Sequence, residues 1–457
     1  MWKRVVVRSA LRRRRVRRYV HSKLAWNRLY RVTSYLKSAL WTAPLVAILL
    51  VLVAAPFVRR LDAWLDWKIV AIGESGLAAM YQTVITLTLS FLVFTFGSLL
   101  VAIQVASGQL TPRIIATTLL RNNVVRFSVG LFVFTLMVAV IALNRSGTET
   151  AAPQLVALIT ATLGVACIAN FLFLIDYAAR LLRPVSVVAS VGNDGAEAIR
   201  SVYPARSGDL VAVAAPLRAQ LGAPTRTITH AGASGTVLAV DLATIVALAR
   251  RHAGVVELLP QVGDFVAADE PLFALYAGAA RIDERALRAT VAFGAERTIE
   301  QDPMFAFRIL VDIALKALSP AINDPTTAVI AIDQVHRLMR VLGKRQLRGE
   351  IACDDTGEPR MIFRTPNWED YVHLACHEIR MCGADNAQIA RRLRAMLENL
   401  QASLPATRGA SLAVELSLLD RAIDTSYAYP EDRALARIPD SQGLGGSLRP
   451  NRSRAAP

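Results

Sequence analysis

The stretch from Leu77 to Pro112 reads LAAMYQTVITLTLSFLVFTFGSLLVAIQVASGQLTP. From Leu77 to Val105 it contains no charged residue, and at about 1.5 Å per residue a helix of this length crosses the hydrocarbon core of a bilayer. The sequence therefore predicts a membrane-spanning helix here, and the chain on either side is organised around it.

Small and polar residues repeat along one side of this predicted helix. At about 100° per residue they fall in a narrow stripe, whereas the larger Phe91, Leu92 and Leu99 lie elsewhere on the helix. Because a polar group that faces lipid is costly, we expect the stripe to face either protein or water. These two environments correspond to helix packing and to a pore, and both interpretations stay open. The stripe consists of Thr83, Thr86, Ser90, Gly97, Gln104 and Gly108.

Three more apolar runs are long enough to cross a membrane, one before this stretch and two after it. The expected fold class is a membrane α-helical unit with four transmembrane helices, followed by a cytoplasmic α+β region with a small barrel-like β segment and a helical bundle. Lys and Arg are concentrated before the first run, after the second and after the fourth, so the positive-inside rule places both termini in the cytoplasm. The four spans are expected at residues 39–58, 77–105, 124–143 and 155–178, within a transmembrane domain of residues 39–183.

Composition favours a bacterial inner (plasma) membrane protein. Arginine far outnumbers lysine and alanine is abundant, which is typical of a GC-rich bacterial genome. The formal net charge is +16, and residues 1–38 are basic with no Asp or Glu. We expect this segment to bind anionic lipid headgroups, because each basic residue beside a bilayer contributes about 1 kcal/mol. Nucleic acid is not an expected partner.

Beyond Pro184 the hydropathy falls, and the pattern changes. In residues 184–280, the strand-like SGTVLAVD and VVELLP flank the helix-like LATIVALARRHA, and VGDFVAADEPLFALY has the pattern of a small barrel hairpin. Residues 281–428 are predicted to form a helical domain, and residues 429–457 are predicted to be disordered. The helices are expected at residues 285–299, 304–318, 326–342, 368–382, 387–403 and 410–423.

The segment GDFVAADEPLF resembles half of the motif of lipoyl and biotinyl carrier domains. In those carriers the cofactor is attached to a lysine at a hairpin tip. The chain has no lysine between Lys68 and Lys316. We therefore expect a structural or docking module with no covalent cofactor, and no other cofactor is indicated.

The sequence SPAINDP interrupts the helical pattern of the 281–428 segment. Asp324 fits the N-cap of the helix that follows, with Pro325 at its first position. Alternatively, polar side chains at this helix start could bind a cation or a phosphate. The candidate residues of this cytoplasmic loop are Asn323, Asp324, Thr326 and Thr327.

His373 and His377 stand four residues apart on a predicted helix. Two imidazoles on one face can hold zinc or copper, but the order H-E-x-x-H is absent and no third ligand is assured, so a packed or solvated pair is favoured over a metal site. The chain also has no G-x-S-x-G, no Walker loop and no G-x-G-x-x-G opening a helix after a strand. We expect neither a metal site nor enzymatic activity.

Two separated motifs resemble a known family. They are VAIQVASGQLTPRII, at the end of the central stretch, and RTIEQDPMFAFRILVDIALKALSPAINDPTTAVIAIDQVHRLM in the predicted helical domain. Both are similar to an uncharacterised family of bacterial predicted membrane proteins, domain of unknown function 2254. The resemblance covers residues 35–423 and implies a four-span inner-membrane protein with a cytoplasmic domain. It implies little about activity.

Two functions fit these features. The first is an oligomeric channel or transport-class protein, in which copies of the central helix line a narrow path and the cytoplasmic domain regulates it. The second is a membrane-anchored sensor or scaffold that transports nothing, in which the stripe packs helices and the cytoplasmic region binds a protein or a lipid partner. A homo-oligomer is expected for the first, because a single four-span chain is too small to enclose an ion path.

Overall fold

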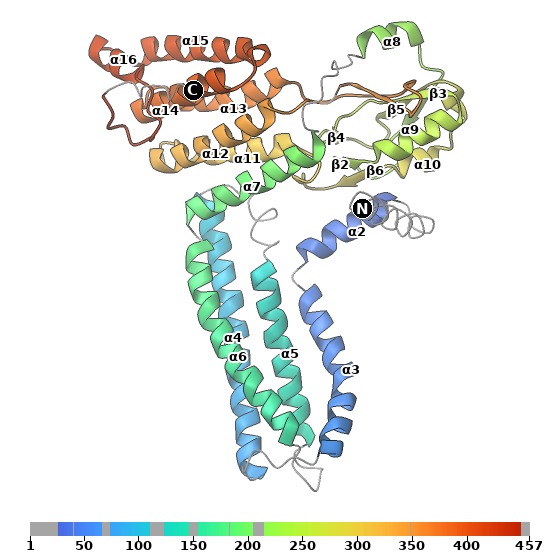
Figure 1. Cartoon of the computed structure of the whole chain (residues 1–457), viewed down its shortest axis with the longest axis vertical. Helices are drawn as coiled ribbons and strands as arrows, with labels where there is room; N and C mark the ends of the chain where they lie inside the picture. The colour runs from blue at the N-terminus through green and yellow to red at the C-terminus, as the bar shows by residue number, and fades with distance from the viewer. Residues whose placement is uncertain are drawn as a thin grey trace, which may run out of the picture. The chain divides into compact units, whose positions relative to one another are not determined.

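The computed structural model describes residues 26–39, 41–65, 74–109, 123–145, 154–181, 183–203, 214–347 and 349–448. Most of the basic N-terminal segment, residues 1–25, lies outside the described residues. The chain forms two compact units (Figure 1). We call them the membrane unit, Leu36–Val187, and the C-terminal unit, Val188–Pro457 together with Met1–Tyr35.

Among the described residues of the membrane unit, four helices are long and apolar enough to cross a membrane. They overlap the four predicted spans. The first helix continues past the predicted end at residue 58, so that Pro56 lies inside it. The helices are α3 (Thr42–Leu65), α4 (Glu74–Gln109), α5 (Asn123–Arg145) and α6 (Gln154–Leu181).

Side chains of α4, α5 and α6 fill the interior of the membrane unit. Phe132 of α5 is fully buried, and Phe91 of α4 stacks on Phe171 of α6 with ring centroids 4.2 Å apart. At Gly130 the backbone of α5 comes so close to α3 that a Cβ would lie 3.2 Å from the Cβ of Ala43. Such close contacts stabilise helix pairs in lipid, where burial of apolar surface offers no driving force.

The C-terminal unit contains two β-sheets. In the larger sheet the strand order is β1-β5-β3-β8-β7, and β3 and β8 run parallel. The smaller sheet has the order β4-β2-β6. Helix α9 (Leu242–Arg251) covers the larger sheet, and its buried Ile245 and Ala249 belong to the core cluster of the sheets. The strands are β1 (Arg226–Thr229), β2 (Gly235–Val240), β3 (Gly254–Leu258), β4 (Phe265–Val266), β5 (Pro271–Ala277), β6 (Val291–Gly294), β7 (Ile351–Cys353) and β8 (Pro359–Phe363).

Neither sheet closes into a barrel, which corrects the barrel-like hairpins predicted for residues 184–280. β4 and β5 were expected to pair with each other, but β4 pairs with β2 while β5 lies between β1 and β3. The five central residues of β5 are all buried, so this strand needs neighbours on both edges and cover on both faces. The strands predicted at SGTVLAVD and VVELLP are confirmed as β2 and β3, with α9 between them.

Helices make up the rest of the C-terminal unit, and most of them match the predicted ranges. As predicted, Asp324 is the N-cap of α12 and Pro325 is its first residue. The helix predicted at 285–299 is wrong, because the chain forms only the short α10 and then β6, whose Val291 and Phe293 pair with β2. The helices are α2 (Trp26–Ser38), α7 (Pro184–Val202), α8 (Ala215–Leu221), α10 (Glu284–Arg288), α11 (Pro303–Ala317), α12 (Pro325–Gly343), α13 (Trp368–Gly383), α14 (Ala387–Ser403), α15 (Gly409–Ser426) and α16 (Pro430–Ala436).

Residues 429–448 fold onto the helices, although the sequence predicts disorder from residue 429 onward. They comprise α16 and an irregular segment, residues 437–448, that we call the C-terminal strap. The guanidinium of Arg391 on α14 is 1% exposed and holds the strap through backbone carbonyls, which composition does not reveal. It donates to the carbonyl oxygens of Ile438 (3.0 Å), Gly445 (2.7 Å) and Ser447.

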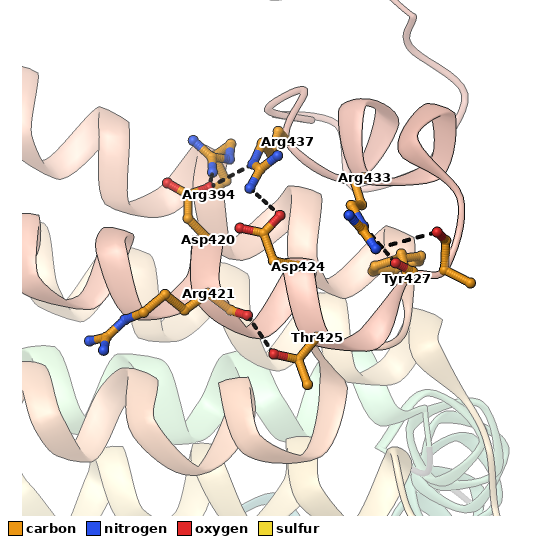
Figure 2. Close-up of polar contacts among 9 residues, drawn as sticks. Arg394, Asp420, Arg421, Asp424, Thr425, Tyr427, Arg433 and Arg437 are labelled. Atoms are coloured by element: carbon orange, nitrogen blue, oxygen red, sulfur yellow. Dashed lines mark hydrogen bonds and ion pairs between the residues drawn. The ribbon is translucent and has the colours of Figure 1, made fainter.

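A second network fixes the start of the strap (Figure 2). Asp420 of α15 accepts from Arg394 of α14 and from Arg437, and Arg437 also reaches Asp424 at 2.6 Å. In the same view the side chain of Arg421 points away from this network. The Arg–Asp pairs therefore join α14, α15 and the strap into one packed body.

A substitution at Gly195 tests the close packing of α7. A Cβ at this position would lie 2.7 Å from the Cβ of Ala306 on α11 and 3.0 Å from Leu338 Cδ1 on α12. We expect Gly195→Ala to lower the free energy of unfolding by about 1–2 kcal/mol, because the overlap outweighs the better helix propensity of alanine. Chemical unfolding of the detergent-solubilised protein measures this. Gly409→Ala is the control, since no heavy atom lies within 4 Å of its added Cβ; equal stability of the two variants would contradict the prediction.

Replacing Arg391 by Met tests how the strap is held. Three part-buried carbonyl oxygens lose this donor, so we expect the strap to open more often and trypsin to cleave near Arg437 about tenfold faster than in the wild type. Limited proteolysis followed by mass spectrometry measures the rate. Arg421→Met is the matched control, because this arginine is exposed on the neighbouring α15. Unchanged cleavage in Arg391→Met would show that other contacts hold the strap.

Candidate functional site

All six residues of the predicted stripe lie on the exposed side of α4. The opposite side of the helix points into the membrane unit, where Tyr81, Thr88 and Thr95 are buried. The line is not continuous, because Val93 and Val101, one turn before and after Gly97, are 71% and 55% exposed. Among the described residues of one copy, none covers the six positions of the stripe.

The polar side chains of the stripe differ in their hydrogen bonds. The hydroxyls of Thr83, Thr86 and Ser90 donate to carbonyl oxygens four residues earlier in α4, at 2.8 to 2.9 Å. The amide side chain of Gln104 has no partner among the residues that the structure describes. At Gly97 an added Cβ would meet no atom within 4 Å. Among the polar side chains of the stripe whose hydrogen bonds are described, only that of Gln104 has no hydrogen-bond partner among the described residues.

The predicted loop at the start of α12 has the geometry of a helix cap. One carboxylate oxygen of Asp324 accepts from the backbone N–H of Thr327 at 3.1 Å, and the other accepts from its hydroxyl. Asn323 has a positive φ of 47°, and Thr326 is exposed. The structure brings these four residues together, and both oxygens of the acid are engaged within the chain.

His373 and His377 stack on one face of α13, with ring centroids 4.6 Å apart. Both line a polar cavity beside the start of the helix. Nδ1 of His377 lies 3.1 Å from an Nη of Arg380. Among the described residues, no group of three or more His, Cys, Asp or Glu side chains is placed to hold a metal ion.

An ion-pair network joins α11 to α13 beside this cavity. Arg308 of α11 donates to both carboxylate oxygens of Glu378, at 2.6 and 2.8 Å, and to Asp312 at 2.7 Å. These hydrogen bonds hold the pKa of the Glu378 carboxyl below its ordinary value. Asp302, close in sequence, pairs separately with Arg297 at 2.7 Å. The network orients α13 and with it the two histidines.

Sequence reasoning did not single out the loop between β8 and α13. Its Arg364, Thr365 and Asn367 line the same cavity as the histidines. The Pro366–Asn367 pair does predict a helix start, but no local pattern shows that the loop faces His373 and His377. The cavity depends on long-range packing and was therefore missed.

The comparisons with known proteins decide the family. The family model described as "Predicted membrane protein (DUF2254)" matches residues 37–399, which is most of the chain. The chain belongs to the DUF2254 family. This DUF2254 protein is also 26% identical over 427 residues to uncharacterized proteins of Mycobacterium bovis and of two strains of Mycobacterium tuberculosis.

The match to these mycobacterial relatives covers 90% of the chain and 81% of theirs. No solved structure gives a significant match to the chain. The resemblance stated from the two motifs is therefore confirmed at the level of the family. The relatives carry no functional name, so the function of this DUF2254 protein has to be argued from its own residues.

Glu378→Gln tests the network that positions α13. Because hydrogen bonds from Arg308 lower the pKa of Glu378 below 4.5, the folded protein favours the carboxylate. We expect the wild type to be more stable by about 1 kcal/mol above pH 4.5, a modest value because the carboxylate is partly exposed, and we expect the difference to shrink as the pH falls below 4.5. Chemical unfolding at neutral and acidic pH measures the difference.

The control for this prediction is Glu369→Gln, on the exposed first turn of the same helix. This carboxyl forms no ion pair among the described residues, so its replacement removes a carboxylate from the same helix and leaves the contact between Arg308 and Glu378 in place. A stability difference for Glu378→Gln that is the same at both pH values would contradict the role given to the ion pair.

Proposed function

We propose that this DUF2254 protein is an oligomeric channel or transport-class protein of the bacterial inner membrane, with a cytoplasmic regulatory domain. In this proposal several copies assemble so that the exposed faces of their α4 helices line a narrow pathway. The C-terminal unit is the regulatory domain, and both termini are cytoplasmic, in keeping with the distribution of Lys and Arg. We propose no enzymatic activity.

The exposed amide of Gln104 carries this proposal. It stands at the end of a span that extends from Ser75 to Val105 and has no partner among the described residues. A primary amide near hydrocarbon costs free energy unless it forms hydrogen bonds, and either water or a second copy supplies them. A water-filled path between copies satisfies Gln104 and uses the hydroxyls of Thr86 and Ser90 as further polar lining.

The packing inside one copy favours a pathway between copies. The aromatic rings of Phe91, Phe132 and Phe171 occupy the interior between α4, α5 and α6. Gly97 has no side chain on the exposed face of α4, so a second helix can approach closely at this position. The basic N-terminus is proposed to bind anionic headgroups at the same membrane.

The alternative is a membrane-anchored sensor or scaffold that transports nothing. The observation that favours it is the polar cavity beside His373 and His377, because a ligand-binding unit joined to membrane helices needs no conducting path. In that case the stripe of α4 packs against another helix and excludes water. The accessibility of the stripe distinguishes the two functions.

Single cysteines at Thr86, Ser90, Gly97 and Gln104 test the pathway. In native membranes, and in a background without Cys167, Cys353, Cys376 and Cys382, we expect a water-soluble thiol reagent to modify all four positions. Cysteines at Phe91 and Leu99, which pack against the core of the membrane unit, are expected to stay protected. The modified fraction is measured by mass spectrometry.

Leu100→Cys is the control for exposure to lipid rather than water. Leu100 is 62% exposed on α4 but lies outside the stripe, so lipid is expected to shield it from the reagent. Protection of all four stripe positions would contradict the pathway in the sampled state and favour the sensor or scaffold. Equal reaction at Leu100 would show that the reagent reports simple exposure.

A further inference from the structure

The polar cavity of the C-terminal unit has the size of a ligand site. It lies between the start of α11, the loop before α13 and the first turns of α13, and its volume of about 550 Å³ is within the roughly 300–1,000 Å³ typical of ligand pockets. Met304, Pro366 and Leu374 supply apolar lining. All of these elements belong to one compact unit, so the cavity is a feature of that unit alone.

The acidic side chains of the cavity already accept hydrogen bonds from the chain. Two of them accept a backbone N–H, and the third is neutralised by an arginine. These pairs are Glu350 with the N–H of Ala214 (2.8 Å), Asp370 with the N–H of Asn367 (2.9 Å) and Glu378 with Arg308 (2.6 and 2.8 Å). The N-terminus of α13 is also closed, because Asn367 and Asp370 form a capping box.

Several donors at the cavity have no acceptor among the described residues. The guanidinium of Arg364 forms no hydrogen bond or ion pair there. Arg380 can only donate, so Nδ1 of His377 is the acceptor of their 3.1 Å contact and the ring N–H is at Nε2. No described residue accepts from that N–H, nor from the side-chain NH2 groups of Gln261 and Asn367. The cavity therefore has unmatched donors and engaged acids.

We propose that this cavity binds a small hydroxylated organic phosphate. Arg364 and the Nε2–H of His377 hold the phosphate oxygens, because a guanidinium fork and further N–H donors match an oxyanion. Glu350 and Asp370 each keep a second carboxylate oxygen for hydroxyl groups of the ligand. Met304 and Leu374 contact its carbon skeleton. This site does not depend on the proposed pathway along α4.

A glycerol phosphate group has this chemistry, and it occurs both free and in lipids. The test titrates the full-length, detergent-solubilised protein with glycerol 3-phosphate by calorimetry. We expect binding, and a dissociation constant about tenfold higher in both Arg364→Gln and His377→Gln. A second arm uses nanodiscs with and without phosphatidylglycerol, a lipid whose headgroup is a glycerol phosphate with free hydroxyl groups. Arg421→Gln is the control in both arms, because this exposed arginine lies outside the cavity.

Binding in either arm that weakens in the two cavity variants and not in Arg421→Gln supports the proposal, and the responding arm identifies the source. The proposal is overturned if neither probe binds at concentrations that would reveal a dissociation constant of about 1 mM, or if binding is the same in all variants. Unchanged unfolding curves of the variants confirm that they are folded. Since no readout involves α4 or transport, these outcomes are separate from those of the thiol experiment.

Discussion

The membrane unit depends on one constraint, namely that hydrocarbon offers no hydrogen bonds. Backbone groups meet it by forming helices, and the hydroxyls of α4 meet it by donating to carbonyls of their own helix. A hydroxyl satisfied in this way can face lipid, protein or water at little cost. The hydroxyls of the stripe are therefore weak evidence for what this face of α4 contacts. The amide of Gln104, which has no partner among the described residues, is stronger evidence.

In the C-terminal unit, α14 places three charged arginine side chains in a packed core. Arg391, Arg392 and Arg394 are 1%, 5% and 8% exposed, and each has a different set of partners. Arg392 reaches Asp333 at 2.7 Å and His336 at 3.1 Å. Burial and the charge of Arg392 lower the pKa of His336 to about 4, so that the ring stays neutral and can accept from the guanidinium.

Buried ion pairs seldom add net stability, because desolvation offsets most of the attraction. Removing a single partner is costly, however, since the other is left uncompensated. Arg392 and Arg394 form ion pairs, whereas Arg391 donates to backbone carbonyls. Because each of the three is directed at a different segment, together they fix the rotation and register of α14 against α12, α15 and the strap. Specificity of packing is the main contribution that we assign to them.

The parts of the fold that could be predicted are those set by local chemistry. Charge-free length defines the four spans, and Asp324 followed by Pro325 defines the start of α12. The predictions are wrong where contacts between residues distant in sequence determine the structure. The sequence of β5 predicts a hairpin with β4, yet its neighbours in the sheet are β1 and β3. The composition of the strap predicts disorder, because Arg391, which holds it, lies about fifty residues away in sequence.

The candidate sites also divide into those that local sequence predicts and those that depend on contacts between distant segments. Helical spacing was sufficient to find the stripe, because it needs only one element, and to find the pair His373 and His377. The cavity needs four separate segments, including the loops that contain Gln261 and Arg364, and no periodicity relates them. The sheets bury their apolar side chains in separate clusters, and the polar groups of the cavity lie where the chain passes from β8 into the helices.

The same passage from β8 to α13 fixes both ends of the loop that lines the cavity. β8 pairs with β3 and β7, and four residues separate its end from the start of α13 at Trp368. The indole N–H of Trp368 donates to the carbonyl of Arg408 at 3.1 Å. The loop is thus held at both ends, by a sheet and by a capped, buried helix start. The backbone of such a loop keeps its position without a ligand, so that binding orders fewer residues and more of the interaction energy contributes to affinity.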